Sequence, residues 1–246
     1  MLQVCLNGPH TPAGHNRIPV IPVTPVTPDE LAAAAREAVA AGAEDVHPHP
    51  KDAQGRDSLA PAEVAAAVTA VQSAVPGIRV GVTTGAWAVP DPVERERLVR
   101  SWTVLPDHAS VNWHKDGAAS VTDALLEHGV GIEAGIFSGT DAARRFLAWP
   151  RAHRVLRVLA EVMDEDPHTA PATAAALLRQ LTPAAELGIL LHGQGAAAWP
   201  VLRMALARGL HTRIGLEDAS QLPDGAPAPD NAELVRAARR YAPSGT

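Results

Sequence analysis

The sequence has little cysteine, no long apolar run and no excess of basic residues, and each of these absences excludes a class of protein. Cys5 is the one cysteine among 246 residues, so no internal disulfide framework can form and a reducing compartment is expected. No stretch approaches the roughly 20 apolar residues that span a bilayer. With 21 basic against 27 acidic residues and a net charge of −6, the chain lacks the basic footprint of a nucleic-acid-binding protein.

The first residues, Met1–Asn7, also lack the charged region and following apolar run of a signal peptide. We therefore expect a cytoplasmic protein that binds neither membrane nor nucleic acid. Cys5 lies low on the first predicted strand with no evident base beside it, which favours a packed thiol over a nucleophile.

Strand-type runs alternate with alanine- and leucine-rich helical stretches along the whole chain, which demands parallel strands joined by helical crossovers. We predict strands over Gln3–Asn7, Glu44–His49, Arg79–Thr84, Ala109–His114, Val130–Phe137, Val155–Glu161, Leu187–His192 and Thr212–Glu217. Helices are expected over Pro28–Ala41, Pro61–Ala74, Asp91–Trp102, Ala118–Glu127, Thr140–Trp149, Ala170–Leu181, Gly195–Ala207 and Asp230–Tyr241.

Eight strand–helix units in 246 residues match a (β/α)8 TIM barrel, an α/β fold. The alternative is a doubly wound open sheet, but no G-x-G-x-x-G turn follows the first predicted strand. We therefore predict one barrel domain over residues 1–246. Its long loops are Gly8–Thr27, Pro50–Ala60, Val162–Thr169 and Asp218–Pro229, which all leave the ends of strands that carry active sites in barrels.

Two histidines, His47 and His49, close the second predicted strand. Residues two apart on a strand share a face, roughly 6.5–7 Å apart along it, so both imidazoles can reach one metal at about 2.0–2.1 Å. Taken alone, the H-x-H pair is weak evidence for a metal site, because a pair of solvent-facing histidines is the alternative in a chain with 11 histidines.

The eighth predicted strand adds two ionisable residues to the same rim. A period of two places Arg213 and Glu217 inside the barrel, and strands two and eight both neighbour strand one. Glu217 is therefore expected beside His47 and His49, and two histidines with one carboxylate form a catalytic zinc set with an open fourth position. The alternative for Glu217 is an ion pair with Arg213.

Other inward positions also turn polar at the strand ends, where buried barrel layers normally hold Val, Ile and Leu. They are Asn7, Thr83, Ser110, Asn112, His114, Glu133 and His192. For each residue alone a satisfied hydrogen bond in the core is an alternative, but together they describe the mouth of an active site. We assign Asn7, Ser110, Asn112 and His192 to substrate binding.

These residues resemble the β-keto acid cleavage enzymes, also described as 3-keto-5-aminohexanoate cleavage proteins, over essentially the whole chain. The resemblance rests on Asn7-Gly8, Thr27-Pro28-Asp29-Glu30-Leu31, Val46-His47-Pro48-His49-Pro50-Lys51-Asp52, Val82-Thr83-Thr84-Gly85, Ala109-Ser110-Val111-Asn112, Val130-Gly131-Ile132-Glu133-Ala134-Gly135, Arg213-Ile214-Gly215-Leu216-Glu217-Asp218 and Asn231. It implies a zinc-dependent barrel that condenses a β-keto acid enolate with acetyl-CoA and releases acetoacetate and a new acyl-CoA.

The resemblance also implies roles for single residues. Zinc would bind to His47, His49 and Glu217, and Asp218 would be the catalytic base. Arg213 and the Thr83 hydroxyl would hold that base, and Glu133 would line the amine or polar tail of the substrate. A homo-oligomer, as a tetramer, is implied as well.

General chemistry agrees with this reaction. A metal that binds the keto and carboxylate oxygens polarises the carbonyl, and a carboxylate within hydrogen-bond reach can then remove an α-proton. Asp218 directly follows a predicted ligand, so it is well placed to do this. No organic cofactor is needed.

Two other functions stay open at this point. One is a metal-dependent hydrolase of the amidohydrolase kind, which carries its H-x-H on strand one and further histidines on strands five and six. Here the H-x-H is on predicted strand two, and predicted strands five and six carry none. The other is a barrel without catalysis that binds a metabolite, against which the full set of His47, His49, Glu217 and Asp218 speaks.

Overall fold

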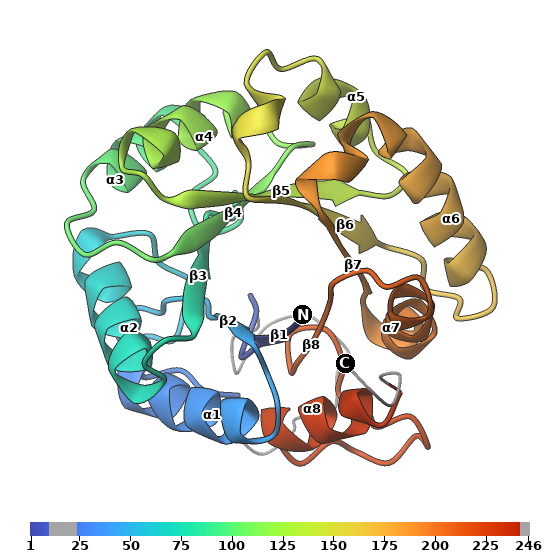
Figure 1. Ribbon diagram of the computed structural model, residues 1–246. Coiled ribbons are helices and arrows are strands. Elements are labelled where there is room, and N and C mark those ends of the chain that lie inside the picture. The colour runs from blue at the N-terminus through green and yellow to red at the C-terminus, as the bar shows by residue number, and fades with distance from the viewer. Residues whose placement is uncertain (10–23, 242–246) are drawn as a thin grey trace.

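The computed structural model describes residues 1–9 and 24–241, which form a (β/α)8 barrel (Figure 1). Its strands are β1 (Leu2–Cys5), β2 (Asp45–His47), β3 (Arg79–Thr83), β4 (His108–Asn112), β5 (Gly131–Phe137), β6 (Arg157–Val162), β7 (Ile189–Gly193) and β8 (Thr212–Ile214). They pair in parallel in the order β7-β6-β5-β4-β3-β2-β1-β8. A parallel bridge between Leu190 and His211 brings the two outer strands together. The predicted fold is confirmed.

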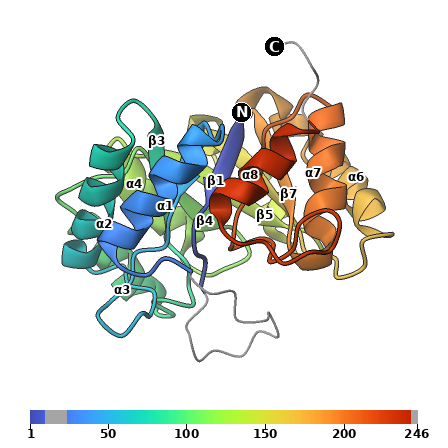
Figure 2. The same cartoon turned by 90° about the horizontal axis from the view of Figure 1, so that it is seen from below.

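Eight α-helices surround the strands in the described part of the chain (Figures 1 and 2). They are α1 (Pro28–Ala40), α2 (Pro61–Ala74), α3 (Pro92–Arg100), α4 (Ala118–Glu127), α5 (Ala142–Leu147), α6 (Ala170–Gln180), α7 (Ala198–Ala207) and α8 (Asn231–Arg239). The described residues also form the short 3-10 helices η1 (Ala152–Arg154), η2 (Thr182–Leu187) and η3 (Gly195–Ala197). Within residues 1–9 and 24–241, no helix has both the length and the apolar character needed to cross a membrane.

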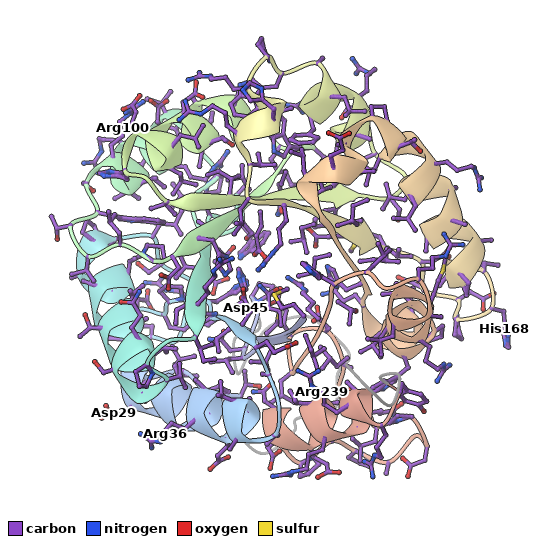
Figure 3. All side chains as sticks on the ribbon, viewed as in Figure 1. Asp29, Arg36, Asp45, Arg100, His168 and Arg239 are labelled. Atoms are coloured by element: carbon purple, nitrogen blue, oxygen red, sulfur yellow. The ribbon has the colours of Figure 1, made fainter. Side chains whose placement is uncertain are left out.

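The hydrophobic core lies between the strands and the helices. Val4, Val46, Val80 and Ile132 alternate with polar residues along their strands and are fully buried against this outer layer. The inner face of the barrel holds buried charged side chains instead, and Figure 3 shows Asp45 inside the ring of strands. The period-two alternation of the sequence therefore separates an apolar outside from a polar inside.

Five predicted strands, those that correspond to β1, β2, β3, β4 and β8, end earlier in the structure than the alternation indicates. Strand β2 ends at His47, so His49 lies beyond it, and β8 ends at Ile214, so Glu217 does too. The chain turns at Gly215, whose carbonyl accepts hydrogen bonds from the N–H groups of Asp218 and Ala219 at 2.9 Å each. Gly215 packs so closely on β1 that a Cβ there would lie 2.0 Å from the Cys5 carbonyl oxygen.

Long loops were predicted at the carboxyl ends of the strands, and the first of them is Gly8–Thr27. Residues 10–23 of this loop lie outside the described residues. Helix α1 begins with a capping box, in which the Thr27 hydroxyl accepts from the Glu30 N–H at 3.3 Å. The Glu30 carboxylate accepts from the Thr27 N–H at 2.9 Å, which fixes where α1 begins.

Candidate active site

A cavity of about 220 Å³ opens at the carboxyl ends of the strands. Of the eleven predicted site residues, seven line it: His47, His49, Thr83, Ser110, Asn112, Arg213 and Glu217. Asp218 and His192 are buried directly behind this lining, because both contact residues that belong to it. Asn7 and Glu133 lie in other environments, described below.

His47, His49 and Glu217 offer ligand atoms that all lie within 4.8 Å of one another. The Nε2 atom of His49 is 3.4 Å from Oε2 of Glu217. Within residues 1–9 and 24–241, this Oε2 and Nδ1 of His47 are buried without a hydrogen-bond partner. Burial lowers the pKa of His47 to about 3, so its imidazole is neutral and has a free lone pair. Two histidines, one carboxylate and unpartnered buried atoms fit a divalent metal such as zinc.

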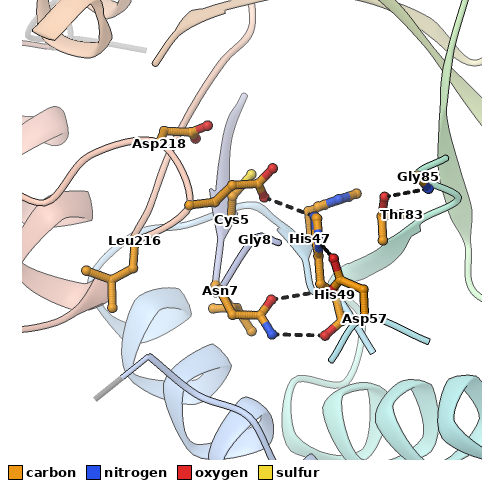
Figure 4. Close-up of polar contacts among 12 residues, drawn as sticks. Cys5, Asn7, Gly8, His47, His49, Asp57, Thr83, Gly85, Leu216 and Asp218 are labelled. Carbon is orange, nitrogen blue, oxygen red and sulfur yellow. Dashed lines mark hydrogen bonds and ion pairs between the residues drawn. The ribbon is translucent and has the colours of Figure 1, made fainter. Parts of the chain in front are cut away.

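Asn7 fixes the backbone that carries His49 (Figure 4). Its amide accepts from the His49 N–H at 2.7 Å and donates to the His49 carbonyl at 2.9 Å. It also donates to the Pro25 carbonyl at 3.1 Å. The first strand thereby holds the segment beyond β2, and the contacts of Asn7 are to this backbone.

The imidazole of His49 is held from outside the cavity by Asp57, which lies in the loop after β2. Oδ2 of Asp57 is 3.3 Å from Nδ1 of His49 and accepts from the Trp87 indole N–H at 2.5 Å. The Lys51 ammonium donates to the other Asp57 oxygen at 2.6 Å. Burial opposes protonation of His49, but Glu217 and Asp57 raise its pKa to about 9. A histidine that gives Nδ1–H to a carboxylate presents Nε2 to a metal.

Asp218 sits behind the cavity wall and is held by Arg213, which donates to its carboxylate at 2.9 Å and to Glu217 at 3.2 Å. Burial raises the pKa of Asp218 to about 7, although Arg213 opposes the shift. Burial acts on Glu217 in the same direction, but Arg213 and His49 hold its pKa well below the usual range. The adjacent carboxyl groups are therefore an ionised ligand candidate and a base candidate that titrates near neutral pH.

The structure does not bring Thr83 into hydrogen-bond contact with Asp218. The Thr83 hydroxyl lines the cavity and accepts a hydrogen bond from the Gly85 N–H at 3.0 Å (Figure 4). His192 does contact Asp218, because its Nδ1 is 3.4 Å from Oδ1 of that residue. Of these two, His192 is therefore the direct neighbour of the candidate base.

Glu133 is fully buried in an ionic network on the inner face of the barrel, and the cavity lining does not include it. Arg157 donates to Glu133 at 2.7 Å and to Asp45 at 2.9 Å. The His108 ring is 3.3 Å from Glu133 and 2.9 Å from Asp45. Gln3 donates to both carboxylates. Glu133 thus has three close polar partners, Arg157, His108 and Gln3, and Nδ1 of His47 lies farther off at 3.8 Å.

The residues of the cavity and its surroundings that were not singled out from the sequence include Asp57, Trp87 and Glu161. Asp57 and Trp87 stand in loops, where no period assigns a side chain to a face. Glu161 carries a usable signal, because it ends a predicted strand in the same way as the polar residues that were selected. Burial raises the pKa of Glu161 to about 8.

The fold and these donors define a barrel with a candidate divalent-metal centre at its catalytic end. The family model for the beta-keto acid cleavage enzyme matches residues 1–244. The chain belongs to the β-keto acid cleavage enzyme family, which confirms the resemblance seen in its motifs.

Solved structures with the same fold include ObcA in a binary complex with oxaloacetate, which is 19% identical with a TM-score of 0.65. That match covers 89% of this chain and 63% of ObcA, so the chain spans less than two thirds of the length of ObcA. A ternary complex of ObcA with a C4-CoA adduct and oxalate is 20% identical, with a TM-score of 0.67 and coverages of 89% and 63%.

The barrel is also shared with proteins of other families. A type I 3-dehydroquinate dehydratase from Clostridium difficile is 13% identical over 100% of this chain and 93% of its own, with a TM-score of 0.64. A search of the curated proteins gives no match. At such identities these likenesses describe the fold alone.

Proposed function

We propose that the protein is a zinc-dependent β-keto acid cleavage enzyme that uses acetyl-CoA and releases acetoacetate and a new acyl-CoA. The observation that carries this proposal is the convergence of His47, His49 and Glu217 within 4.8 Å, with Asp218 held beside them by Arg213. Membership of the family supports the class of reaction.

His47, His49 and Glu217 would hold the zinc ion. Lewis-acid polarisation of the keto carbonyl is the chemistry that zinc supplies when bound there. The chain itself contributes the base: Asp218 takes a proton from C2 of the β-keto acid, and Arg213 keeps the carboxylate oriented through its 2.9 Å hydrogen bond. A pKa near 7 suits this task at neutral pH, because a base works best when its pKa is close to the working pH.

The remaining bond changes are those of a Claisen condensation followed by its reverse. C2 of the keto acid forms a bond to the acetyl carbonyl carbon, and the CoA thiolate leaves. The thiolate then attacks C3, the C2–C3 bond breaks, and C2 regains a proton. Acetoacetate therefore carries C1 and C2 of the keto acid and both acetyl carbons, and the rest of the keto acid leaves as acyl-CoA.

The substrates are supported by the ligands of a structural neighbour. ObcA has been solved with oxaloacetate, a β-keto acid, and with a C4-CoA adduct. These ligands are the two chemical classes that the proposed reaction joins. We also propose a cytoplasmic homo-oligomer, a tetramer as the family resemblance implies, which light scattering after gel filtration tests.

Metal analysis and turnover test this proposal together. We expect about one zinc per chain, lost in His47→Ala/His49→Ala and retained in the matched control His153→Ala/His168→Ala, because both control histidines are exposed. A panel of β-keto acids with acetyl-CoA should yield acetoacetate with the wild type and the control only. Full zinc occupancy in His47→Ala/His49→Ala would falsify the metal site.

A further inference from the structure

Lys51, in the loop after β2, is a buried ammonium group without a role in the proposed chemistry. It is one of only two lysines in the chain, and its side chain is 1% exposed. Its Nζ atom donates to the Gly8 carbonyl and to Oδ1 of Asp57, each at 2.6 Å. A buried charge is costly unless it is paired and hydrogen-bonded, so these two contacts fix where the Lys51 side chain lies.

The contact with Asp57 leads to His49. Lys51 and Asp57 face each other across an antiparallel bridge, in a hairpin that the Ser58 N–H closes by donating to the Pro50 carbonyl at 2.9 Å. Oδ2 of Asp57, the oxygen that Lys51 does not contact, lies 3.3 Å from Nδ1 of His49 (Figure 4). Lys51 therefore holds one carboxylate oxygen and thereby orients the other toward the imidazole.

The contact with Gly8 leads to Glu217. Gly8 follows β1 with a φ of +68°, and a Cβ there would lie 2.7 Å from Cγ of Glu217 and 3.0 Å from its Cβ. The Gly8 backbone thus packs directly on the aliphatic part of the Glu217 side chain, and Lys51 holds this backbone by its carbonyl group. One ammonium group therefore contacts the supports of both His49 and Glu217, whose Nε2 and Oε2 atoms are 3.4 Å apart.

The other support of His49 reaches that ligand candidate alone. The Trp87 indole stacks on the His49 ring with centroids 5.8 Å apart and an interplanar angle of 13°. Its N–H donates to the same Asp57 oxygen that contacts His49. Trp87 thus constrains one imidazole, whereas the contacts of Lys51 extend to both sides of the metal site.

The stability of the fold does not by itself explain a buried Lys51–Asp57 pair. Compared with apolar side chains of similar size, a buried ion pair often adds no net stability. The geometry of the two contacts points to another role. We propose that Lys51 is a positioning residue of the metal site, which holds His49 through Asp57 and Glu217 through Gly8 at the separation that one zinc ion requires. This inference rests on the proposed function, which assigns zinc to these ligands.

Lys51→Met tests this role, because it keeps the approximate length of the side chain and removes the charge and the three donors. Competition with a chromogenic chelator measures the Kd for zinc. It should rise about 10–100-fold, the usual effect of losing a group that orients a metal ligand. The matched control is Lys115→Met, the same change at the other lysine, which is exposed and should leave the Kd for zinc unchanged.

Cobalt(II) in place of zinc reports the arrangement of the ligands. Its visible absorption bands depend on the coordination geometry, so at saturating cobalt the spectrum of Lys51→Met should differ from that of wild type. The spectrum of Lys115→Met should not differ. If Lys51 only stabilises the loop, the folded and metal-saturated variant will give the wild-type spectrum, which would contradict the positioning role.

A double variant separates folding from positioning. Lys51→Met leaves the Asp57 carboxylate buried without its cation, which destabilises the fold. Lys51→Met/Asp57→Asn removes both charges and avoids this cost. Its Kd for zinc should still be higher than that of Asp57→Asn, because the contact with Gly8 is lost as well. If Lys51→Met does not fold, the comparison of these two variants carries the test.

The positioning role is overturned if Lys51→Met binds zinc as tightly as wild type. The link to Glu217 is overturned if Lys51→Met/Asp57→Asn and Asp57→Asn have the same Kd for zinc. Turnover of β-keto acids with acetyl-CoA is measured separately on the zinc-loaded wild type. If no keto acid gives acetoacetate, the proposed function fails, while a Kd for zinc that depends on Lys51 still establishes its positioning role.

Discussion

Ionisable side chains of the same type in this site differ in pKa because their surroundings differ. His47 and His49 are two residues apart, yet burial lowers the pKa of His47 to about 3, whereas Glu217 and Asp57 overcome burial and raise that of His49 to about 9. Glu217 and Asp218 are adjacent, yet only Asp218 has a raised pKa, of about 7. The opposite pKa shifts of Glu217 and Asp218 separate a ligand candidate from a base candidate.

Asp218→Asn separates the base from the metal ligands. The change keeps the volume and leaves His47, His49 and Glu217 intact, so zinc content should be unchanged. Turnover should fall about 10²–10⁴-fold, the usual contribution of general-base catalysis. By NMR in heavy water, wild type should exchange the α-protons of the keto acid and Asp218→Asn should not. Exchange at the wild-type rate in the variant means that Asp218 is not the base.

Asp57→Asn should weaken zinc binding without removing a ligand. Asp57 accepts from His49, Trp87 and Lys51, and loss of such a partner to a metal-binding histidine typically costs 10–100-fold in affinity, by rough estimate. Competition with a chromogenic chelator measures the Kd for zinc. Asp52→Asn is the control, since Asp52 bonds only within its own exposed loop. Equal zinc affinity in the two variants would contradict this role.

At the scale of elements, alternation predicts the eight units correctly, because apolar runs and capping residues are local features. Where a strand ends is not local. Strand β8 ends at Ile214, and the next residue, Gly215, packs on the backbone of Cys5, a contact between residues far apart in sequence. The alternation correctly predicts that Glu217 faces the cavity, although Glu217 lies in the turn after β8 and not in the strand itself.

The alternation of inward and outward residues also does not show how deep an inward side chain lies along the barrel axis. The alternation correctly turns Glu133 inward, but it does not show that Arg157 and His108 neutralise it on other strands. Glu161 has the same inward direction and lies in the cavity lining. Only the register between β5 and β6, in which Glu133 pairs with Arg157 and Phe137 with Glu161, distinguishes their levels. The sequence alone therefore could not show that Glu133 lies outside the cavity lining.

The ionic network across β2, β4, β5 and β6 predicts a pH dependence of stability. Burial opposes protonation of His108, but Glu133 and Asp45 raise its pKa from 6.5 to about 9. The folded protein then holds a proton that the unfolded chain releases, so this contribution is fully present below pH about 6.5 and is lost as pH rises to about 9. It amounts to a few kcal/mol at most, on the order of 3.

Urea unfolding at constant zinc between pH 6 and 9 checks this. The free energy of unfolding of wild type should fall more steeply with pH than that of His108→Gln. Parallel curves would show that His108 does not carry the extra proton, and NMR titration of the His108 imidazole gives the same answer if the variant does not fold.

At the scale of the whole molecule, the barrel closes β2 and β8 onto β1, and this closure brings His47 and His49 to Glu217 across most of the sequence. The family model matches residues 1–244, so the family is assigned from nearly the whole chain and not from one motif. The oligomeric state and the cytoplasmic location stay predictions.

The most direct test of the proposed reaction follows the acetyl carbons. Zinc-loaded enzyme is mixed with 3-oxopentanoate and acetyl-CoA labelled with carbon-13 at both acetyl positions, and the products are read by NMR. Acetoacetate labelled at C3 and C4, together with unlabelled propionyl-CoA, is the predicted result. Unlabelled acetate and propionate, the products of hydrolysis, would contradict the proposed reaction.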